Sequence, residues 1–322
     1  MKKALITGIT GQDGSYLTKF LLDMGYQVVG IIKDSPDANL DNLKYLGVFD
    51  LVDLIKINVM NIHAIKSALE MIKPDEIYNL VAQSSVANSF VNPSVTVGFN
   101  VMTTLNLLEA MRSLDLDAKF YQASSSEMYG KVKSLPVVED SVLHPLSPYA
   151  ISKATGHWLA INYREAYGMF CCCGILFNHE SVLRPPNFVT KKILSAATRI
   201  SRGSNEKLVL GNIEIKRDWG YAPEYIKSMW SMLQQDKPDE YVIATNEAHS
   251  IKEFAELVFA NLGLNWVDHI IIDETLYRRS DIEIIYGNPS KAREQLGWDY
   301  ILKFDEMVSL LVQEELNRHD GC

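Results

Sequence analysis

Residues 124–130, SSSEMYG, place three hydroxyl groups, one carboxylate and one phenol within a single short stretch. Serine and glycine favour turns, so composition alone predicts a plain loop here. The same side chains could instead bind a substrate hydroxyl and transfer protons, with Ser125 and Glu127 as the candidates. The choice between these interpretations depends on the elements that position the stretch.

A glycine-rich loop near the start of the chain is the second chemical feature. The run TGITGQDG places Gly8, Gly11 and Gly14 between an apolar stretch and a helical pattern. Glycines permit a tight turn and the close approach of a pyrophosphate, which then lies at the helix N-terminus. The loop therefore predicts a dinucleotide site. Its spacing differs from the common G-x-G-x-x-G, and a purely structural turn is the alternative.

The residue that closes the second predicted strand decides between NAD and NADP. An acidic residue at this point binds the ribose hydroxyls of NAD, whereas a basic one favours NADP. This chain has Lys33 followed by Asp34. The local pattern therefore leaves both cofactors open.

Tyr149 and Lys153 stand four residues apart on a predicted helix, so they share one face. A free tyrosine has a pKa of about 10, too high for a base near neutral pH. A neighbouring ammonium and an oxidised nicotinamide both favour the phenolate. The pair therefore predicts a base that takes a hydroxyl proton while hydride leaves the same carbon. A surface Tyr/Lys pair without function is the alternative.

Alternating strand and helix patterns in the first half indicate how these groups come together. The predicted strands are 3–7, 27–32, 52–57, 75–82, 119–124 and 170–177, and the predicted helices are 12–24, one ending at about 72, 94–113 and 148–167. This order predicts an α/β fold, a Rossmann-type doubly wound parallel sheet. Ligands bind at the carboxyl ends of such strands, which is where SSSEMYG lies, so the plain-loop interpretation weakens.

Beyond residue 177 the alternation loosens. Helices are predicted at 188–201, 223–235, 250–262 and 304–317, with short strands between them. We expect a dinucleotide-binding domain at 1–177, which also receives part of 215–245. Residues 178–322 would mainly form a smaller α/β substrate-binding domain.

Composition excludes several classes of function. The 322 residues carry a net charge of −9, which argues against a nucleic-acid surface. No uncharged apolar run reaches the roughly 18 residues of a membrane span, and the apolar stretch at the N-terminus stops at Gly8, too early for a signal peptide. Cys171, Cys172 and Cys173 are adjacent, so they alternate faces and are poorly arranged for one metal. We expect reduced thiols, no metal site and a cytoplasmic location.

The order of TGxxGxxG, a serine-containing strand end and YxxxK resembles the extended short-chain dehydrogenase/reductase superfamily. A plain dehydrogenase in that superfamily does not need Glu127. A sugar oxidised at C4 has an acidified C5 proton, which a carboxylate can remove while the C6 hydroxyl leaves as water. Return of hydride to C6 then regenerates the cofactor. Glu127 therefore predicts a 4,6-dehydratase.

Longer strings narrow the resemblance. YQASSSEMYG, SPYAISKATGHWLAINYREAYGM, GILFNHES, NFVTKKI, LGNIEIKRDWGYAPEYI and NPSKAREQLGW, in that order, are similar to the GDP-mannose 4,6-dehydratase family over nearly the whole chain. The dTDP-glucose dehydratases usually carry an aspartate where Ser126 stands, as the acid for C6. The resemblance thus implies that Glu127 handles both proton transfers.

The resemblance also implies the remaining site residues. The catalytic set would be Ser125, Glu127, Tyr149 and Lys153, with Ser125 on the C4 hydroxyl. The residues that would contact NADP, or NAD in its place, are Gly8, Ile9, Thr10, Gly11, Gln12, Asp13, Gly14, Lys33, Asn58, Val59, Leu80, Ala82, Gln83, Ser84, Lys153, His179 and Arg184. The residues that would bind the GDP-sugar are Ser84, Ser125, Asn178, Lys192, Arg217, Arg278 and Asp281. A homodimer or homotetramer is expected of the family.

Several positions depart from the family's pattern. A pair of arginines usually follows the second strand, where this chain has Lys33-Asp34, and Asn58 replaces an aspartate. YRRSDIE replaces RPAEVD, so Asp281 stands in place of a glutamate. These changes leave another GDP-sugar open, such as GDP-manno-heptose. A nucleotide-sugar epimerase or keto-reductase and a non-catalytic dinucleotide sensor are the further alternatives.

Overall fold

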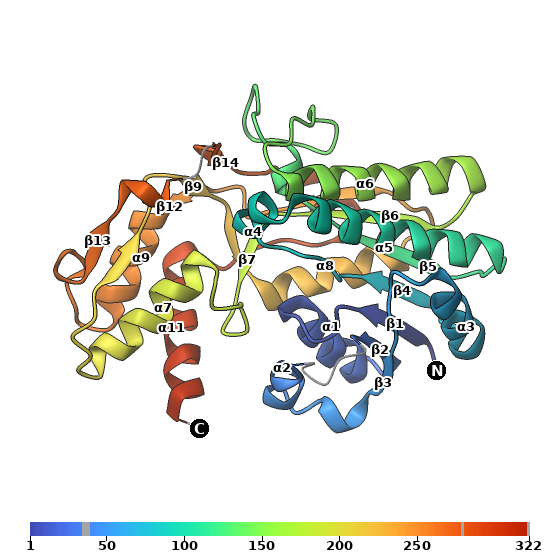
Figure 1. The fold of residues 1–322 in the computed structure, drawn as a ribbon, viewed down its shortest axis with the longest axis horizontal. Coiled ribbons are helices and arrows are strands. Elements are labelled where there is room, and N and C mark those ends of the chain that lie inside the picture. Colours follow the sequence, from blue (N-terminus) through green and yellow to red (C-terminus); the bar gives the residue numbers. More distant parts are fainter. Residues whose placement is uncertain (34–38, 278–279, 321–322) are drawn as a thin grey trace.

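A parallel sheet of seven strands forms the centre of the larger lobe (Figure 1). The computed structural model describes residues 1–33, 39–277 and 280–320. The sheet order is β11-β6-β5-β4-β1-β2-β3. Its strands are β1 (Lys3–Thr7), β2 (Gln27–Ile32), β3 (Asp53–Lys56), β4 (Glu76–Asn79), β5 (Lys119–Ser125), β6 (Cys171–Leu176) and β11 (Glu240–Ile243). This confirms the predicted Rossmann-type sheet.

Helices cover both faces of the sheet. On one face lie α1 (Gln12–Asp23) and α8 (Ala222–Gln234), and on the other lie α3 (Ile62–Ile72), α5 (Pro93–Ser113) and α6 (Pro148–Tyr167). Each face has its own apolar core. Cys172 packs in the α1 side and Cys171 and Cys173 pack in the α5–α6 side, so the predicted alternation of the three thiols is confirmed.

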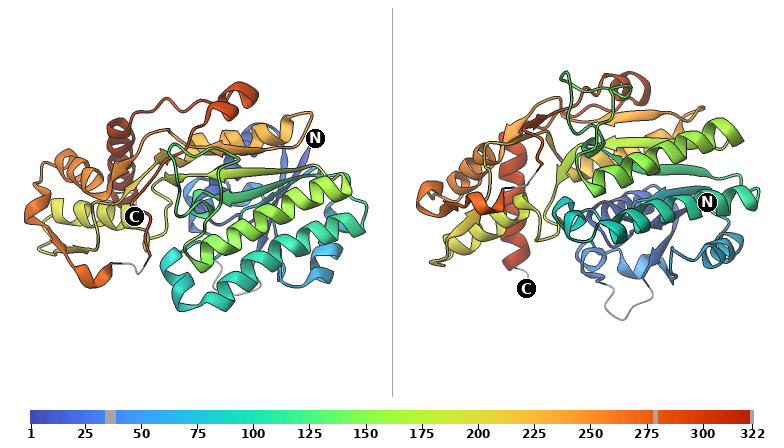
Figure 2. Two further views of the ribbon diagram at one scale, coloured as in Figure 1. Left: turned by 90° about the horizontal axis from the view of Figure 1, so that it is seen from above. Right: turned by 45° about the horizontal axis from the view of Figure 1, so that its top comes forward.

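The smaller lobe lies beyond the carboxyl ends of the strands and has a separate apolar core (Figures 1 and 2). Its helices are α7 (Val189–Ser201), α9 (Ile251–Asn261) and α11 (Phe304–Asp320). Its short strands are β7 (Asn178–Glu180), β8 (Leu208–Leu210), β9 (Lys216–Arg217), β10 (Trp219–Tyr221), β12 (His249–Ser250), β13 (Ile270–Ile272) and β14 (Ile284–Ile285). Because α8 and β11 lie between these elements in sequence yet pack on the large sheet, the chain crosses between the lobes more than once. The domain boundary at residue 177 stays a prediction.

Short elements account for most of what the sequence patterns missed. The helices α2 (Asp41–Tyr45), α4 (Val86–Val91) and α10 (Ser290–Leu296) are too brief to show a helical period. The 3₁₀ turns lie at Phe49–Leu51, Ser126–Met128, Trp266–Asp268 and Glu274–Leu276.

The predicted strand at 75–82 is too long by three residues at its end. The N–H groups of Leu80 and Val81 approach the Thr7 hydroxyl at 3.2 and 3.3 Å, which turns the chain away from the sheet. The apolar sequence LVA gives no sign of this tertiary contact.

Helix α6 begins and ends where the sequence predicts. The Ser147 hydroxyl accepts a hydrogen bond from the N–H of Ala150 at 3.0 Å, and Pro148 occupies the first turn. Gly168 ends the helix with φ of 67°, the left-handed conformation that glycine favours. Among the described residues, no helix is both long and apolar enough to cross a membrane. The predicted cytoplasmic location stays a prediction.

Candidate active site

The glycine loop forms a close-packed turn at the start of α1. Gly8 has φ of 73°, and a Cβ atom there would lie 2.8 Å from the backbone nitrogen of Val81. A Cβ on Gly14 would lie 2.3 Å from the carbonyl oxygen of Gly8. Gly11 precedes the helix and offers no side-chain cap, so the first N–H groups of α1 remain for a ligand. The loop thus fits the pyrophosphate of a dinucleotide.

The other residues of the loop pack inward or toward the smaller lobe. Ile9 and Gln12 are buried, and the carbonyl of Thr10 accepts from the Asn42 amide at 3.0 Å. Gln12 donates to the carbonyl of His179 at 3.0 Å, and its own oxygen accepts from the Ser181 hydroxyl at 2.8 Å. The glycine loop is therefore hydrogen-bonded directly to β7.

An ion pair between Asp13 and His179 strengthens this junction. His179 Nε2 lies 3.0 Å from both carboxylate oxygens of Asp13, and its Nδ1 lies 2.7 Å from the carbonyl of Phe177. Both ring nitrogens face acceptors, so the arrangement favours the doubly protonated imidazolium.

Burial and charge act in opposite directions on both members of the pair. For Asp13, burial raises the pKa, but the His179 charge and its hydrogen bonds outweigh this effect and hold the pKa at about 2. For His179, burial lowers the pKa, but Asp13 outweighs burial and leaves the pKa raised. The family resemblance implies that both residues contact the cofactor, but it gives no sign that they pair with each other.

The turn after β5 brings the candidate catalytic groups together. Ser125 ends the strand, and its hydroxyl accepts a hydrogen bond from the N–H of Glu127 at 3.3 Å. Tyr149 lies in the first turn of α6, which packs against this turn; the nearby Ser125 side chain lowers the pKa of its phenol, and the Glu127 carboxylate raises it. The SSSEMYG stretch is thus a 3₁₀ turn that faces α6.

The turn itself is held by its remaining residues. Met128 and Tyr129 are fully buried, and the Tyr129 hydroxyl donates to the carbonyl of Val138 at 2.9 Å. Gly130 has φ of 53°, and a Cβ there would collide with the carbonyl of His144. These three residues support the turn.

Lys153 lies beside Tyr149 on the same face of α6. Its Nζ is 6.0 Å from the centre of the Tyr149 ring and donates to the carbonyl of Ala123 at 2.8 Å. Burial lowers the pKa of Lys153 to about 8, against the opposing charge of Asp13. Burial also raises the pKa of Tyr149 to about 12, reinforced by Glu127 and opposed by Ser125 and Arg184. The protein alone therefore holds the phenol protonated at neutral pH.

The other residues expected at the cofactor surround the ends of β2, β3 and β4. Lys33 is exposed directly after β2. After β3, the Asn58 side chain accepts from the N–H of Met60 at 2.9 Å, and Val59 is buried. After β4 come Leu80, Ala82 and Ser84, with the Gln83 N–H held by Asn100 Oδ1 at 2.8 Å. Arg184 pairs with Glu180 at 3.2 Å.

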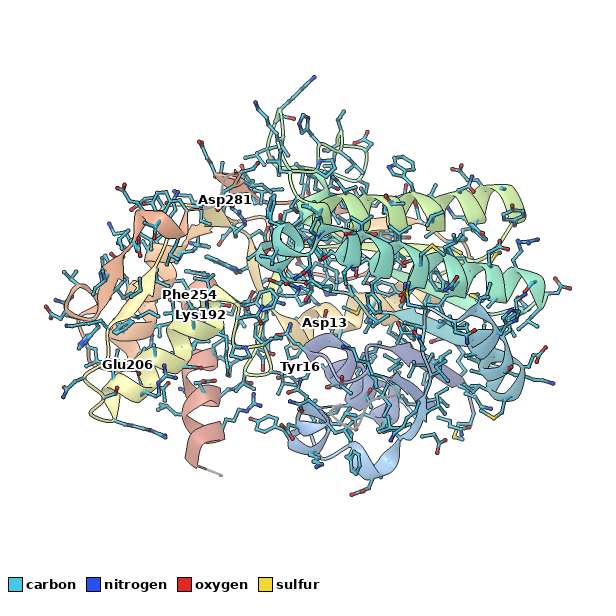
Figure 3. The ribbon with its side chains drawn as sticks, viewed as in Figure 1. Asp13, Tyr16, Lys192, Glu206, Phe254 and Asp281 are labelled. Atoms are coloured by element: carbon cyan, nitrogen blue, oxygen red, sulfur yellow. The ribbon has the colours of Figure 1, made fainter. Side chains whose placement is uncertain are left out.

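Most residues expected at the sugar nucleotide come from the smaller lobe, whereas Ser84 and Ser125 lie on the larger one. Asn178 lies on β7, and Lys192 is exposed on α7. Arg217 is buried on β9, where its Nη2 donates to Asp281 Oδ1 at 2.9 Å and its Nη1 to the carbonyl of Ile282 at 2.5 Å. Figure 3 shows Asp13 on the larger lobe and Lys192 and Asp281 on the smaller one. Arg278 lies outside the described residues.

Sequence reasoning missed a buried amide network beneath the site. Asn79 donates to Gln122 Oε1 at 2.8 Å and accepts from the Thr7 hydroxyl at 2.8 Å. Gln122 donates in turn to the carbonyl of Ala123 at 3.3 Å, the same oxygen that binds Lys153. Three polar residues near the carboxyl ends of buried strands were the available signal.

The chain is similar to known proteins over nearly its whole length. The family model described as GDP-mannose 4,6 dehydratase matches residues 5–311. The chain belongs to this family. A relative from Arabidopsis thaliana, GDP-mannose 4,6 dehydratase 1, is 48% identical and aligns over 98% of this chain and 90% of its own length. A Vibrio cholerae GDP-mannose 4,6-dehydratase is 40% identical over 98% of this chain and 94% of its own.

Solved structures of lower identity share the fold of this GDP-mannose 4,6-dehydratase family member. The dTDP-glucose 4,6-dehydratase DesIV from Streptomyces venezuelae, with NAD, has a TM-score of 0.87 at 21% identity, over 99% of this chain and 98% of its own. RMD from Pseudomonas aeruginosa, complexed with NADPH, has a TM-score of 0.82 at 21% identity, over 99% and 100%.

We predict that Asp13→Asn lowers the free energy of unfolding of this family member by about 2 kcal/mol near pH 5, the equivalent of the Asp13 pKa shift. The lowered pKa of Asp13 contributes stability above pH 4 that is lost as the pH falls through about 2. The raised pKa of His179 contributes stability that is fully present below its unfolded value of about 6.5 and is lost as the pH rises through the higher pKa of the folded state. Urea denaturation across this pH range measures the difference.

The matched control is Asp23→Asn at the other end of α1, where the ion pair with Lys19 is exposed. We expect it to change stability by less than about 1 kcal/mol at any pH. If the two variants gave the same pH profile, the buried pair would not have the charges assigned to it.

Proposed function

We propose that the protein is a GDP-sugar 4,6-dehydratase that converts GDP-mannose to GDP-4-keto-6-deoxymannose and water. Family membership over residues 5–311 supports the GDP-sugar class. The observation that carries the proposal is the position of the Glu127 carboxylate, two residues after Ser125 in the turn that packs against α6. A dehydrogenase needs only the hydroxyl, the phenol and the lysine, whereas removal of water needs a further proton carrier.

A nicotinamide cofactor fits the residues described above. The glycine loop and the first turn of α1 would hold its pyrophosphate, and Leu80, Ala82, Gln83 and Ser84 would line its ribose side. Arg184 and His179 would lie toward the nicotinamide, with His179 acting through the ion pair that fixes Asp13. When bound, the cofactor accepts a hydride from C4 and returns it to C6.

Tyr149 takes the proton of the C4 hydroxyl in this proposal, and Ser125 orients that hydroxyl. Burial works against the phenolate, so the base must be activated by positive charge. Lys153 supplies part of that charge from the same face of α6, and the oxidised nicotinamide supplies the rest.

Glu127 removes the C5 proton of the ketone and delivers a proton to the C6 hydroxyl, which leaves as water. After hydride returns to C6, a proton is needed at C5, and Tyr149, which holds the proton taken from the C4 hydroxyl, can supply it. Ser126 is buried and carries no carboxylate, so within this turn Glu127 is the acid that serves C6.

The GDP-sugar would be held mainly by the smaller lobe. Arg217 and Lys192 supply positive charge for the diphosphate, Asn178 lies at the start of β7, and Ser84 reaches in from the larger lobe. Arg278 is proposed from the sequence alone. Asp281, in its ion pair with Arg217, would fix the guanidinium and replaces a glutamate of the family. That replacement keeps other GDP-sugars, including GDP-manno-heptose, as substrates to test.

We predict that Glu127→Gln binds cofactor normally but forms no 4-keto-6-deoxy product, because the amide cannot accept the C5 proton. A panel of GDP-, UDP- and dTDP-sugars with mass spectrometric detection of water loss measures this. The matched control is Glu139→Gln in the following loop, a carboxylate that accepts from the Val242 N–H. Full activity of Glu127→Gln would remove Glu127 from the mechanism, and net oxidation of added NADPH would identify a reductase instead.

We also propose that the cofactor is NADP rather than NAD. Lys33 is exposed directly after β2, the position that decides between the two, so its ammonium can bind a 2′-phosphate. Asp34, the competing acidic residue, lies outside the described residues.

We predict that Lys33→Glu raises the Kd for NADP about tenfold and changes the Kd for NAD much less, since one charge-assisted contact is lost. Isothermal titration calorimetry with both cofactors measures the two constants. Lys237→Glu, an exposed lysine after α8, makes the same change of charge and should alter neither. Equal losses for both cofactors would exclude a role in reading the phosphate.

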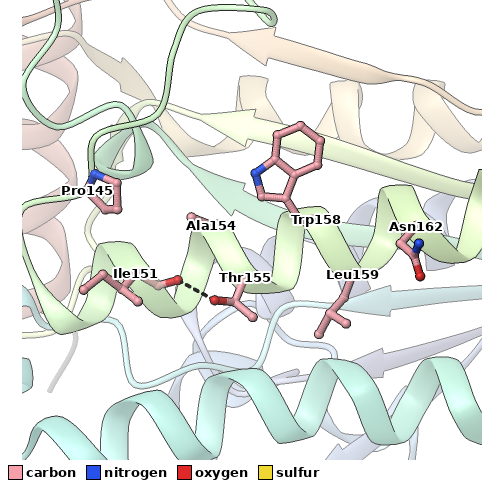
Figure 4. Close-up of a pocket in the computed structure, with 7 residues that line it drawn as sticks. All are labelled: Pro145, Ile151, Ala154, Thr155, Trp158, Leu159 and Asn162. Atoms are coloured by element: carbon pink, nitrogen blue, oxygen red, sulfur yellow. Dashed lines mark hydrogen bonds between the residues drawn. The ribbon is translucent and has the colours of Figure 1, made fainter.

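We propose further that the protein forms a homodimer through α5 and α6. Trp158 is 58% exposed and Ile151 is 47% exposed on α6, and Val95 and Met102 are exposed on the neighbouring α5. Trp158 and Ile151 line an apolar hollow of about 400 Å³ (Figure 4). A second copy of this chain would cover both helices, as the family expectation suggests. A tetramer needs a further interface.

We predict that Trp158→Glu converts the dimer to a monomer, because a charge in the centre of an apolar interface stays without a partner. Sedimentation velocity gives the mass of the species. Met71→Glu, at an apolar residue near the end of α3 that is 70% exposed, is the control and should not change the mass. A wild-type chain that sediments as a monomer would contradict the proposal.

A further inference from the structure

The face of α6 that carries Tyr149 and Lys153 continues to His157, another four residues along the helix. Each of these side chains contacts the end of β5. Tyr149 lies near Ser125, whose side chain lowers the pKa of the phenol, Lys153 Nζ donates to the carbonyl of Ala123, and His157 Nδ1 lies 3.0 Å from the Ser124 hydroxyl. One row of the helix thus lies against three successive residues of the strand.

The Ser124–His157 hydrogen bond is isolated from solvent. Ser124 is 3% exposed and His157 is 4% exposed. Burial lowers the pKa of His157 to about 4, so the imidazole is neutral near pH 7. The neutral ring forms one hydrogen bond with the Ser124 hydroxyl. A neutral buried ring of this kind holds geometry and does not donate charge to the site.

The bond fixes the backbone next to the candidate substrate contact. Ser124 directly precedes Ser125, the last residue of β5, so its hydrogen bond to His157 holds the backbone from which the Ser125 hydroxyl extends. The other contacts constrain Ser125 less, since Lys153 binds the carbonyl of Ala123, two residues earlier, and the Glu127 N–H donates to the Ser125 hydroxyl at a long 3.3 Å.

We propose that His157 is a positioning residue that, through Ser124, sets the Ser125 hydroxyl against Tyr149 for proton transfer from the substrate. The inference rests on the proposed dehydratase function and deepens it. It assigns a role to a residue outside the Y-x-x-x-K pair. A displacement of about 1 Å in a reacting group can cost on the order of 100-fold in rate, so one lost hydrogen bond at this junction should be visible in kcat.

The test compares Ser124→Ala, His157→Leu and His157→Asn in the full-length protein, with kcat and KM measured on GDP-mannose. We expect Ser124→Ala and His157→Leu each to lower kcat roughly tenfold or more with KM nearly unchanged. His157→Asn keeps a polar atom near the place of Nδ1 and should restore most of the rate. The double variant Ser124→Ala/His157→Leu should be no slower than the worse single one, because both remove the same bond.

Ser228→Ala is the matched control. It removes another buried hydroxyl, which donates to the carbonyl of Tyr225 at 2.7 Å in α8, and we expect lower stability with unchanged kcat. Variants of Ser124 and His157 that lose stability like this control while keeping kcat would overturn the inference. So would additive effects in the double variant or an asparagine no better than leucine.

Failure of the proposed function has a different signature, since the wild-type protein would then form no dehydrated product from any sugar of the panel. In that event a crystal structure of His157→Leu still decides the positioning claim. Displacement of Ser125 relative to Tyr149 would support it, and an unchanged Ser125 would refute it.

Discussion

The packing of one helix face against the end of one strand determines the geometry of the candidate site. One face of α6 carries Tyr149, Lys153 and His157. Lys153 donates to the carbonyl of Ala123, and His157 is hydrogen-bonded to the Ser124 hydroxyl. Tyr149 lies near Ser125. All three side chains are nearly inaccessible to water, so breaking a hydrogen bond that one of them makes costs free energy, and its geometry is well fixed. The same burial raises the pKa of the Tyr149 phenol and lowers the pKa of the Lys153 ammonium. The base role proposed for Tyr149 therefore requires positive charge near the phenol.

Two further contacts connect this helix–strand junction to the rest of the molecule. The amide network of Asn79 and Gln122 leads from Thr7, just before the glycine loop, to the carbonyl that binds Lys153. The Asp13–His179 pair ties the same loop to β7 of the smaller lobe. Buried polar contacts therefore lead from β1 to α6, and the Asp13–His179 pair connects the glycine loop to the smaller lobe.

Sequence patterns predicted the parts of the fold that depend on local periodicity. The bounds of β1, β2 and α6 agree with the prediction because their signals are local in sequence. These signals are the short apolar runs of the two strands, the Ser147 cap at the start of α6 and Gly168 at its end. The early end of β4 depends on a hydroxyl more than 70 residues away in sequence. The pairing of Asp13 with His179 and the contact of Ser124 with His157 are equally nonlocal. Helical spacing could have placed His157 in the row, but its partner required the structure.

The central claim is that Glu127 and Tyr149 act on the same sugar, so that oxidation at C4 is followed by loss of the C5 proton and of water. The most direct measurement is the reaction of GDP-mannose in deuterated water with the product examined by NMR and mass spectrometry. We expect a product lighter by one water, with deuterium at C5 and no net change in the oxidation state of the nicotinamide. Dehydrated product without deuterium at C5, or stoichiometric consumption of reduced cofactor, would contradict it.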